Sequence, residues 1–268
     1  MKILLPTDFS ENAELAAHFA IDIAKRTNGH VLAFHAYDVP YSERSMTTSL
    51  LHEMKEIAHE HMDEFKSKVL SPSGVSFDTK VMLGNPIRLS KNLTESEAIE
   101  LVILGTKGAS GIEELLIGSN AASVIQNIDI PVLVIPPKSE VKALKNIVLA
   151  TDMDLRKKER PLLRLKQFAQ IFDSSIDVLH FQDDDGVKKG SREFLESHLN
   201  DIPHTYSVLA QKENLDTDIL NHCQKKNADV VTAITKRYGF FEGLFKKSLT
   251  SKLAYHTTIP MLALHEPK

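Results

Sequence analysis

Short apolar runs alternate with longer amphipathic segments along the first half of the chain. The apolar runs are residues 2–5, 31–34, 81–83, 101–104 and 132–135, and they are typical of buried parallel strands. After the first run, Ser10 is placed to cap a helix whose alanines share one face at positions Ala13, Ala16, Ala17, Ala20 and Ala24. Residues 47–69 predict a long amphipathic helix with the apolar face Leu50, Leu51, Met54, Ile57, Ala58, Met62, Phe65 and Val69.

The same pattern restarts in the second half. The hexapeptide ILLPTD at residues 3–8 returns as IVLATD at residues 147–152, and residues 101–135 align without a gap on residues 230–264 with nine identities. Self-similarity of this kind indicates an internal duplication.

Strands that alternate with helices predict βαβ units, which build an open parallel sheet with helices on both faces. A short polar linker, PPKSE at residues 136–140, separates the copies. We therefore expect two α/β domains of about five strands each, residues 1–138 and 144–268.

Composition narrows the class of protein. The chain has 268 residues, and 32 Lys and Arg against 36 Asp and Glu give a net charge of −4, so no global basic field favours nucleic acid. Its single cysteine, Cys223, excludes an intramolecular disulfide. No stretch approaches the roughly 20 apolar residues of a membrane helix. We expect a globular, cytoplasmic protein that binds neither nucleic acid nor membrane.

The strongest chemical signal follows the fourth apolar run. The chain reads Gly105-Thr-Lys-Gly108, then nine residues, then Gly118-Ser-Asn-Ala before an apolar helix. Ligands of open parallel sheets bind at the carboxyl ends of the strands, and the N-terminus of a helix there offers free N–H groups and a positive dipole end to phosphate. Glycines let backbone come close to an anion, although they also serve ordinary turns.

The second copy tests the two explanations for the glycines. At the aligned positions Gly105 becomes Ile234, Gly108 becomes Arg237 and Gly118 becomes Lys247, whereas the flanking residues persist. The first copy is therefore expected to keep its glycines for a ligand, unless the second loop takes a different conformation. Lys246 adds to the positive charge of the second loop, which either binds another anion or fills a vacant site.

These motifs identify the chain as similar to the universal stress protein family, in a tandem form. The resemblance rests on ILLPTDFS at residues 3–10, on the Gly105-x2-Gly108-x9-Gly118-Ser119 loop, and on IPVLV at residues 130–134. Its loop spacing is that of the ATP-binding branch of the family. The resemblance implies two flavodoxin-like, Rossmann-like five-stranded parallel sheets in the order 3-2-1-4-5. It also implies that the halves pair with pseudo-two-fold symmetry, and it leaves room for a further homodimer.

Carried over by residue, the resemblance implies an ATP site in the first half, with room for Mg2+. Adenine and ribose would contact Asp8 and the backbone near Pro6 and Ala36. The phosphates would lie on Gly105, Thr106, Gly108, Gly118, Ser119, Asn120 and Ala121. Asp8 has an alternative role in capping the following helix, since Asp152 persists in the copy that lost its glycines. Lys107 persists as Lys236 and is interpreted as a solvated lysine.

Other reactive side chains carry weaker patterns. His52 and His59 share a helix face but lie two turns apart, and His61 points elsewhere, so one metal ion is not expected to bind all three. His180 precedes three aspartates at residues 183–185, which suit either a divalent ion or plain solvation. Cys223, within a helical run, is interpreted as a small buried residue.

Three functional hypotheses remain. The first is a nucleotide-dependent regulator of a stress response that binds ATP in its first half, while the second half is a structural partner. The second is a slow ATPase or self-phosphorylating enzyme, although the chain lacks a P-loop and a recognisable catalytic set. The third is an interaction scaffold that binds no nucleotide.

Overall fold

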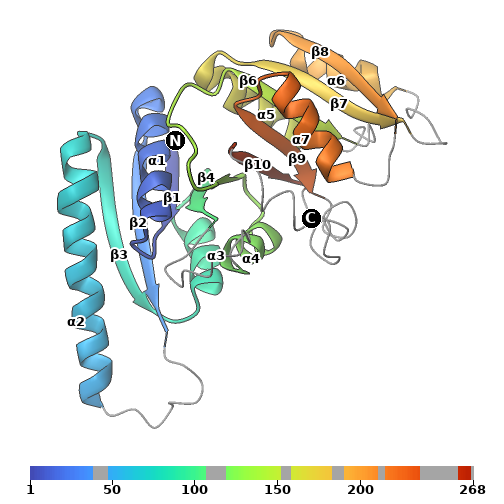
Figure 1. Cartoon of the computed structure of the whole chain (residues 1–268). Helices are drawn as coiled ribbons and strands as arrows, with labels where there is room; N and C mark the ends of the chain where they lie inside the picture. The colour runs from blue at the N-terminus through green and yellow to red at the C-terminus, as the bar shows by residue number, and fades with distance from the viewer. Residues whose placement is uncertain are drawn as a thin grey trace. The chain divides into compact units, whose positions relative to one another are not determined.

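The structure of the chain is a computed structural model, which describes residues 1–38, 48–106, 119–151, 158–182, 190–210, 215–235 and 259–266. The described residues cluster into two compact units, with the division after Pro137. Each unit contains one five-stranded sheet (Figure 1).

The first unit is a parallel sheet in the strand order β3-β2-β1-β4-β5. Its strands are β1 Lys2–Pro6, β2 His30–Tyr37, β3 Ser76–Leu83, β4 Leu101–Gly105 and β5 Val132–Ile135. Its helices are α1 Glu11–Thr27, α2 Thr48–Phe65, α3 Pro86–Ser96 and α4 Ser119–Asn127, and α2 continues through the π-helical turn η2 Lys66–Leu70 and the 3-10 turn η3 Ser71–Ser73. All five predicted apolar runs are strands.

Helices lie on both faces of this sheet, as right-handed crossovers require. Helix α1 packs against η2, the continuation of α2, whereas α3 packs against α4. The two pairs therefore cover opposite faces.

Helix α1 begins as the sequence predicts. The Ser10 hydroxyl accepts a hydrogen bond from the Ala13 N–H at 3.2 Å, which satisfies one of the unpaired donors of the first turn. The predicted alanine face is buried in full. Because alanine side chains are small, the helix axis lies close to the strands, and this close approach later determines what residue 105 must be.

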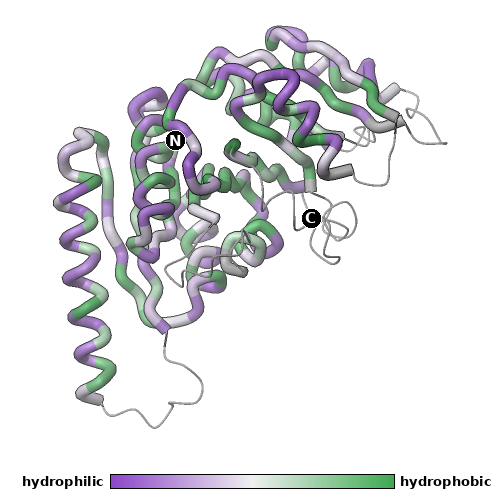
Figure 2. The backbone as a smooth tube through the Cα atoms, in the orientation of Figure 1, coloured by the Kyte–Doolittle hydropathy of each residue, from purple (hydrophilic) through white to green (hydrophobic). Residues whose placement is uncertain are grey.

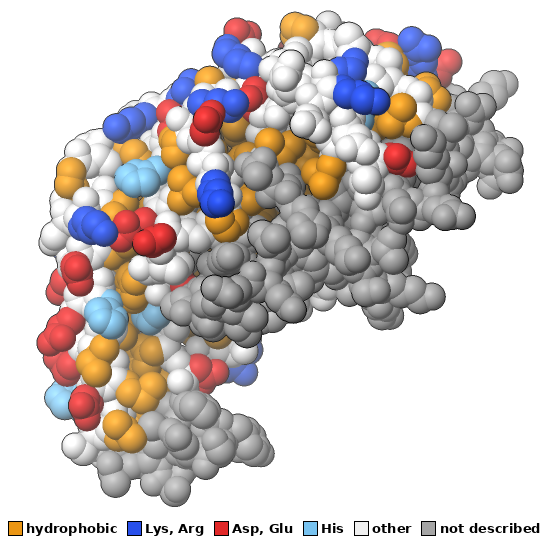
Figure 3. Space-filling view, viewed as in Figure 1, with side chains coloured by type: hydrophobic (Ala, Val, Ile, Leu, Met, Phe, Trp, Pro, Cys, Tyr) orange, Lys and Arg blue, Asp and Glu red, His pale blue; other side chains and the backbone are white. Residues whose placement is uncertain are grey.

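Helix α2 differs from the prediction along its first half. Ala58, Met62 and Phe65 are buried, but Leu50 and Ile57 are 39% and 44% exposed. Helix α2 reaches beyond the carboxyl ends of β2 and β3, so its amino-terminal half has no strand beneath it (Figure 1). Figure 2 shows hydrophilic and hydrophobic positions alternating along the helix, and Figure 3 shows apolar side chains gathered on this surface.

The second unit repeats the topology of the first. Its strands are β6 Asn146–Thr151, β7 Ser175–Gln182, β8 His204–Ala210, β9 Val230–Thr235 and β10 Met261–His265, in the parallel order β8-β7-β6-β9-β10. Its helices are α5 Glu159–Phe172, α6 Ser191–Leu199 and α7 Leu215–Lys225. Read in chain order within the unit, both sheets have the order 3-2-1-4-5. The predicted fold class is confirmed.

None of the described helices combines the length and apolar character needed to cross a membrane.

Candidate functional site

The structure brings the described candidate residues to one edge of the first sheet. Pro6 ends β1, Ala36 lies near the end of β2, and Gly105 ends β4. Because β1 pairs in parallel with both β2 and β4, these three carboxyl ends share an edge (Figure 1). The strand order reverses at β1, because β2 lies on one side of it and β4 on the other. Open α/β sheets bind ligands at the carboxyl ends of the strands beside such a reversal.

Asp8 lies in the turn between β1 and α1. Its Oδ1 accepts hydrogen bonds from the Ser10 hydroxyl at 2.6 Å and from the Ser10 N–H at 3.1 Å. Ser10 in turn caps α1, so the carboxylate supports the cap from two positions earlier in the chain rather than capping the helix itself. A carboxylate can accept about four hydrogen bonds, and its place in this turn, beside the end of β1, is compatible with the ribose role.

Gly105 has a packing reason of its own. A Cβ at this position would lie 2.8 Å from Cγ and Oδ1 of Asn12 and 2.9 Å from the Asn12 backbone oxygen. Contacts this short with a helix backbone cannot be relieved by a side-chain rotation alone. The close approach of α1 therefore requires glycine here, and the presence of Gly105 does not by itself indicate a ligand.

Thr106 lies in a buried polar network beside this contact. Its N–H donates to the Ile135 carbonyl at 3.1 Å, and its hydroxyl contacts Asn12 Oδ1 at 3.5 Å. The Asn12 amide donates to the same carbonyl of Ile135 at 3.1 Å. The network connects α1 to the carboxyl ends of β4 and β5.

The phosphate end of the predicted site is only partly described. Ser119, Asn120 and Ala121 form the first turn of α4, and the Ala121 side chain is buried, so this residue offers only its backbone to a ligand. Gly108 and Gly118 lie outside the described residues, as do Lys107, Arg237, Lys246 and Lys247. The described part fits a phosphate group, because the leading N–H groups of a helix have no partner within the helix.

Residues 1–136 match the universal stress protein family. The chain belongs to this family. A universal stress protein of Methanocaldococcus jannaschii is 36% identical over 144 residues, which are 52% of this chain and 84% of that protein. A second from the same organism is 28% identical over 156 residues, 52% of this chain and 96% of that protein.

Among solved structures, a universal stress protein from Archaeoglobus fulgidus is similar to the whole chain. The likeness covers 100% of this chain and 97% of that one, with a TM-score of 0.78 and 18% identity. At this identity the likeness shows the fold. Each curated relative named above matches about half of this chain. The likeness that spans both units is therefore the one to the solved structure from Archaeoglobus fulgidus.

Phe9 and His35, which the sequence motifs do not single out, contact each other beside the β1–α1 turn. The Phe9 ring packs against the His35 ring of β2, tilted by 36° with 4.4 Å between ring centroids, and His35 Nδ1 lies 2.8 Å from the Thr7 carbonyl oxygen. Burial lowers the pKa of His35 below its ordinary value, although the hydrogen bond to Thr7 and the nearby charge of Asp8 oppose this effect. Only the tertiary fold brings these residues together, so no sequence spacing reveals the contact.

One cavity of the first unit lies away from this edge. It measures about 700 Å³ and is lined at the amino edge of the sheet by residues such as Lys25, His30 and Ser76. Parallel strands place this edge opposite the one that carries Asp8. None of the predicted nucleotide contacts lines this cavity.

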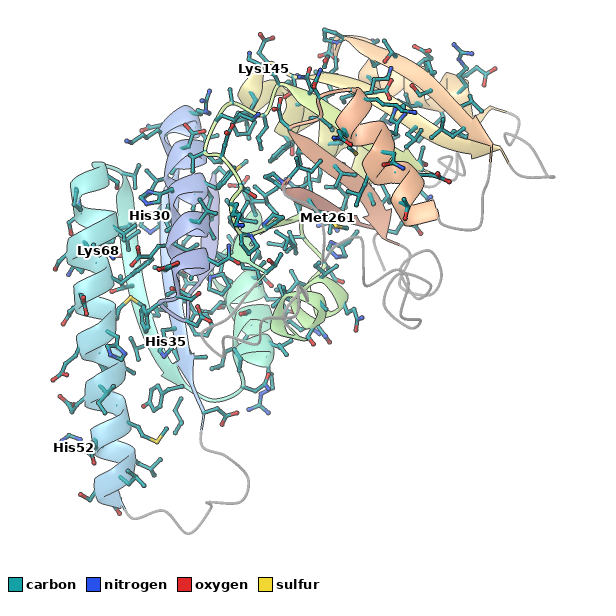
Figure 4. All side chains as sticks on the ribbon, in the orientation of Figure 1. His30, His35, His52, Lys68, Lys145 and Met261 are labelled. Atoms are coloured by element: carbon teal, nitrogen blue, oxygen red, sulfur yellow. The ribbon has the colours of Figure 1, made fainter. Side chains whose placement is uncertain are left out.

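Metal binding finds no support among the described residues, which contain no group of three metal-ligating side chains. His52 lies far along α2 from the level of His35 (Figure 4). His180 is 5% exposed, and neither of its ring nitrogens has a hydrogen-bond partner among the described residues. The aspartates at 183–185 lie outside the described residues.

The second unit contains a buried acid–base pair that the sequence did not suggest. Asp177 of β7 and His222 of α7 are 9% and 7% exposed, and His222 Nε2 lies 2.6 Å from Asp177 Oδ2. Burial alone would raise the pKa of Asp177, but hydrogen bonds to its carboxylate outweigh it and lower this pKa. The donors are Thr205 at 2.6 Å, His222, Lys226 at 3.1 Å and Ser207 at 2.9 Å.

Cys223 follows this pair in α7 and is 2% exposed, as predicted for a small buried residue. Burial and the nearby Asp177 charge raise its pKa to about 12. A thiol this far from ionisation is a poor nucleophile at neutral pH.

Proposed function

We propose that the first unit binds an adenine nucleotide, ATP in the first instance, and that the chain acts as a nucleotide-dependent regulator. The site lies at the carboxyl edge of the first sheet. One observation carries the proposal: the turn with Asp8, the end of β2 with Ala36, the end of β4 with Thr106 and the start of α4 share this edge. Membership of the universal stress protein family supports the proposal.

Each group at this edge suits one part of a nucleotide. The Asp8 carboxylate accepts hydrogen bonds from a ribose hydroxyl or an adenine amine. The first turn of α4, from Ser119 to Ala121, offers backbone N–H donors and the positive end of the helix dipole to phosphate. In the family pattern Gly108 and Gly118 add close backbone approach, and Mg2+ accompanies the phosphates.

The test begins with the purified protein. Denaturation and chromatography should release about one adenine nucleotide per chain, and added ATP should raise the melting temperature, since a ligand bound only by the folded state stabilises it. Gly118→Lys, which copies the second half, should abolish both effects. Ser71→Lys, which adds the same charge at an exposed position before β3, is the matched control.

Asp8→Ala separates the two roles of this residue. Loss of a buried polar partner should weaken ATP binding by about 1–3 kcal/mol. A loss below about 0.5 kcal/mol, the low end for a net hydrogen bond, assigns Asp8 to support of the Ser10 cap alone.

The outcomes also distinguish the other functional classes. Steady ADP production that survives purification and disappears in Gly118→Lys would replace the regulator by a slow hydrolase. Absence of both bound nucleotide and a thermal shift would overturn nucleotide binding and leave a scaffold.

A further inference from the structure

Phe9 has a backbone conformation that aromatic residues rarely adopt. It lies between Asp8 and the cap residue Ser10 with φ of 64°, in the left-handed region. This conformation costs free energy for any residue with a Cβ, and it persists only where the surroundings impose it. The turn that carries Asp8 is therefore held in place by contacts elsewhere.

The Phe9 side chain makes three of those contacts. Its ring lies 4.4 Å from the His35 ring, 5.7 Å from the His61 ring and 5.9 Å from the Phe65 ring, measured between centroids. His35 belongs to β2, whereas His61 and Phe65 belong to α2. In addition, the Phe9 N–H donates to the Thr7 hydroxyl at 3.0 Å.

His35 holds the other side of the same turn. Its Nδ1 lies 2.8 Å from the Thr7 carbonyl oxygen, and because a carbonyl only accepts, Nδ1 carries the hydrogen. One histidine of β2 thus binds the residue before Asp8 and stacks on the residue after it. Figure 4 shows His35 at the level where β2 and α2 run side by side.

We propose that Phe9 and His35 form a clamp of positioning residues, which holds the Asp8 carboxylate in the geometry that binds the ribose or adenine of a nucleotide. This inference rests on the proposed nucleotide function. The clamp also touches α2 through His61 and Phe65, so it couples the site to that helix. By reciprocity, a nucleotide that fixes Asp8 also stabilises this part of α2.

Two substitutions at one position separate the ring from the backbone. Phe9→Ala removes the ring and keeps the cost of positive φ, so the turn relaxes and the ATP dissociation constant rises about tenfold, the equivalent of about 1.4 kcal/mol. Phe9→Gly also removes the ring, but glycine adopts positive φ readily. Its dissociation constant is expected to rise less than about threefold, a fraction of the alanine effect. Equal loss in both variants would overturn the positioning role.

A double-mutant cycle shows whether the clamp acts through Asp8. In the Asp8→Ala background, Phe9→Ala should change ATP affinity by less than about twofold, because the group that it positions is gone. The full tenfold effect in that background would place the action of Phe9 elsewhere. His35→Phe keeps the stacked ring but cannot donate to Thr7, and it should weaken binding through the same cycle.

Hydrogen exchange without nucleotide tests the clamp independently of the proposed function. Phe9→Ala should raise exchange in the turn at residues 7–10 and in α2 around Met62, while Phe9→Gly should raise it in α2 alone. Ile57→Ala, at an exposed position of the same helix, is the control and should change neither.

The results separate the two proposals. If the wild-type protein binds no nucleotide, nucleotide function fails and exchange decides the clamp. If it binds ATP and Phe9→Ala binds equally well, the clamp fails and the function stands. Unchanged exchange in Phe9→Ala also overturns the clamp.

Discussion

The buried pair of Asp177 and His222 occupies positions that are apolar in the first unit, whose strand order is the same. Strands β2 and β7 are both eight residues long, and helices α3 and α7 are both eleven. Aligned from their first residues, Asp177 takes the place of Leu32 and His222 that of Leu93, which are 1% and 4% exposed. The first unit thus shows that leucines are compatible with these positions.

The structure sets the magnitude for each substitution. Asp177→Leu leaves the His222 ring buried without its partner, which should cost about 1–3 kcal/mol of unfolding free energy. His222→Leu removes one charged hydrogen bond but leaves Asp177 three donors, at a cost of about 1.5–3 kcal/mol. The unfolding free energy of the double variant Asp177→Leu/His222→Leu should lie within about 1 kcal/mol of the wild-type value, because apolar replacements of buried pairs are often neutral or stabilising.

The assay is urea unfolding combined with amide exchange of β7 and α7, since two units can unfold in separate steps. The control is the ion pair of Lys166 and Asp201, 2.6 Å apart, whose side chains are 24% and 49% exposed, and its removal should cost less than about 1 kcal/mol. A double variant as unstable as the sum of the single variants would refute the reasoning. It would mean that the two leucines cannot pack between β7 and α7.

The same pair gives the second unit a pH dependence. The pKa of Asp177 is lower in the folded state than its ordinary value, so the unfolded chain binds the proton more readily. The contribution of this group to stability is therefore complete above about pH 4, the ordinary range of an aspartate. It is lost as the pH falls below that value. This loss of stability at low pH should disappear in the double variant Asp177→Leu/His222→Leu.

Three further predictions concern single residues. Gly105→Ala should destabilise the first unit by about 1–3 kcal/mol in thermal unfolding, because its Cβ meets the Asn12 backbone at 2.9 Å; unchanged stability would show that α1 shifts freely. Lysines on β1 and β3 lower the pKa of Glu97 to about 2, so the stability from this carboxylate is full above its ordinary pKa and is lost towards pH 2. Glu97→Gln should remove that portion of the acid titration curve, and an identical curve would contradict the assignment. His180→Leu should maintain or raise the melting temperature, because it removes a buried ring that has no hydrogen-bond partner within the described part of the chain; a marked drop would reveal a partner for that ring.

The pattern of residues along the chain predicts much of the fold. Strands and helices depend on periodicity and on local caps, so the five apolar runs, the Ser10 cap and the alanine face of α1 are all found where the pattern predicts them. The repeated hexapeptide and the gap-free alignment indicate the duplication from the sequence alone. The candidate nucleotide residues follow from spacing and family resemblance, and the parallel sheet brings the described ones to one edge.

Contacts between distant residues were decided only by the tertiary structure. Sequence comparison suggested that the fold does not require the loop glycines, yet Gly105 is required by Asn12, 93 positions earlier in the chain. Likewise, the amphipathic pattern of α2 predicts an apolar face but not how far the strands reach beneath it. The clamp of Phe9 and His35 and the pair of Asp177 and His222 are specific side-chain encounters. Periodicity reports which face of an element is buried, whereas the partner on that face depends on how the elements pack.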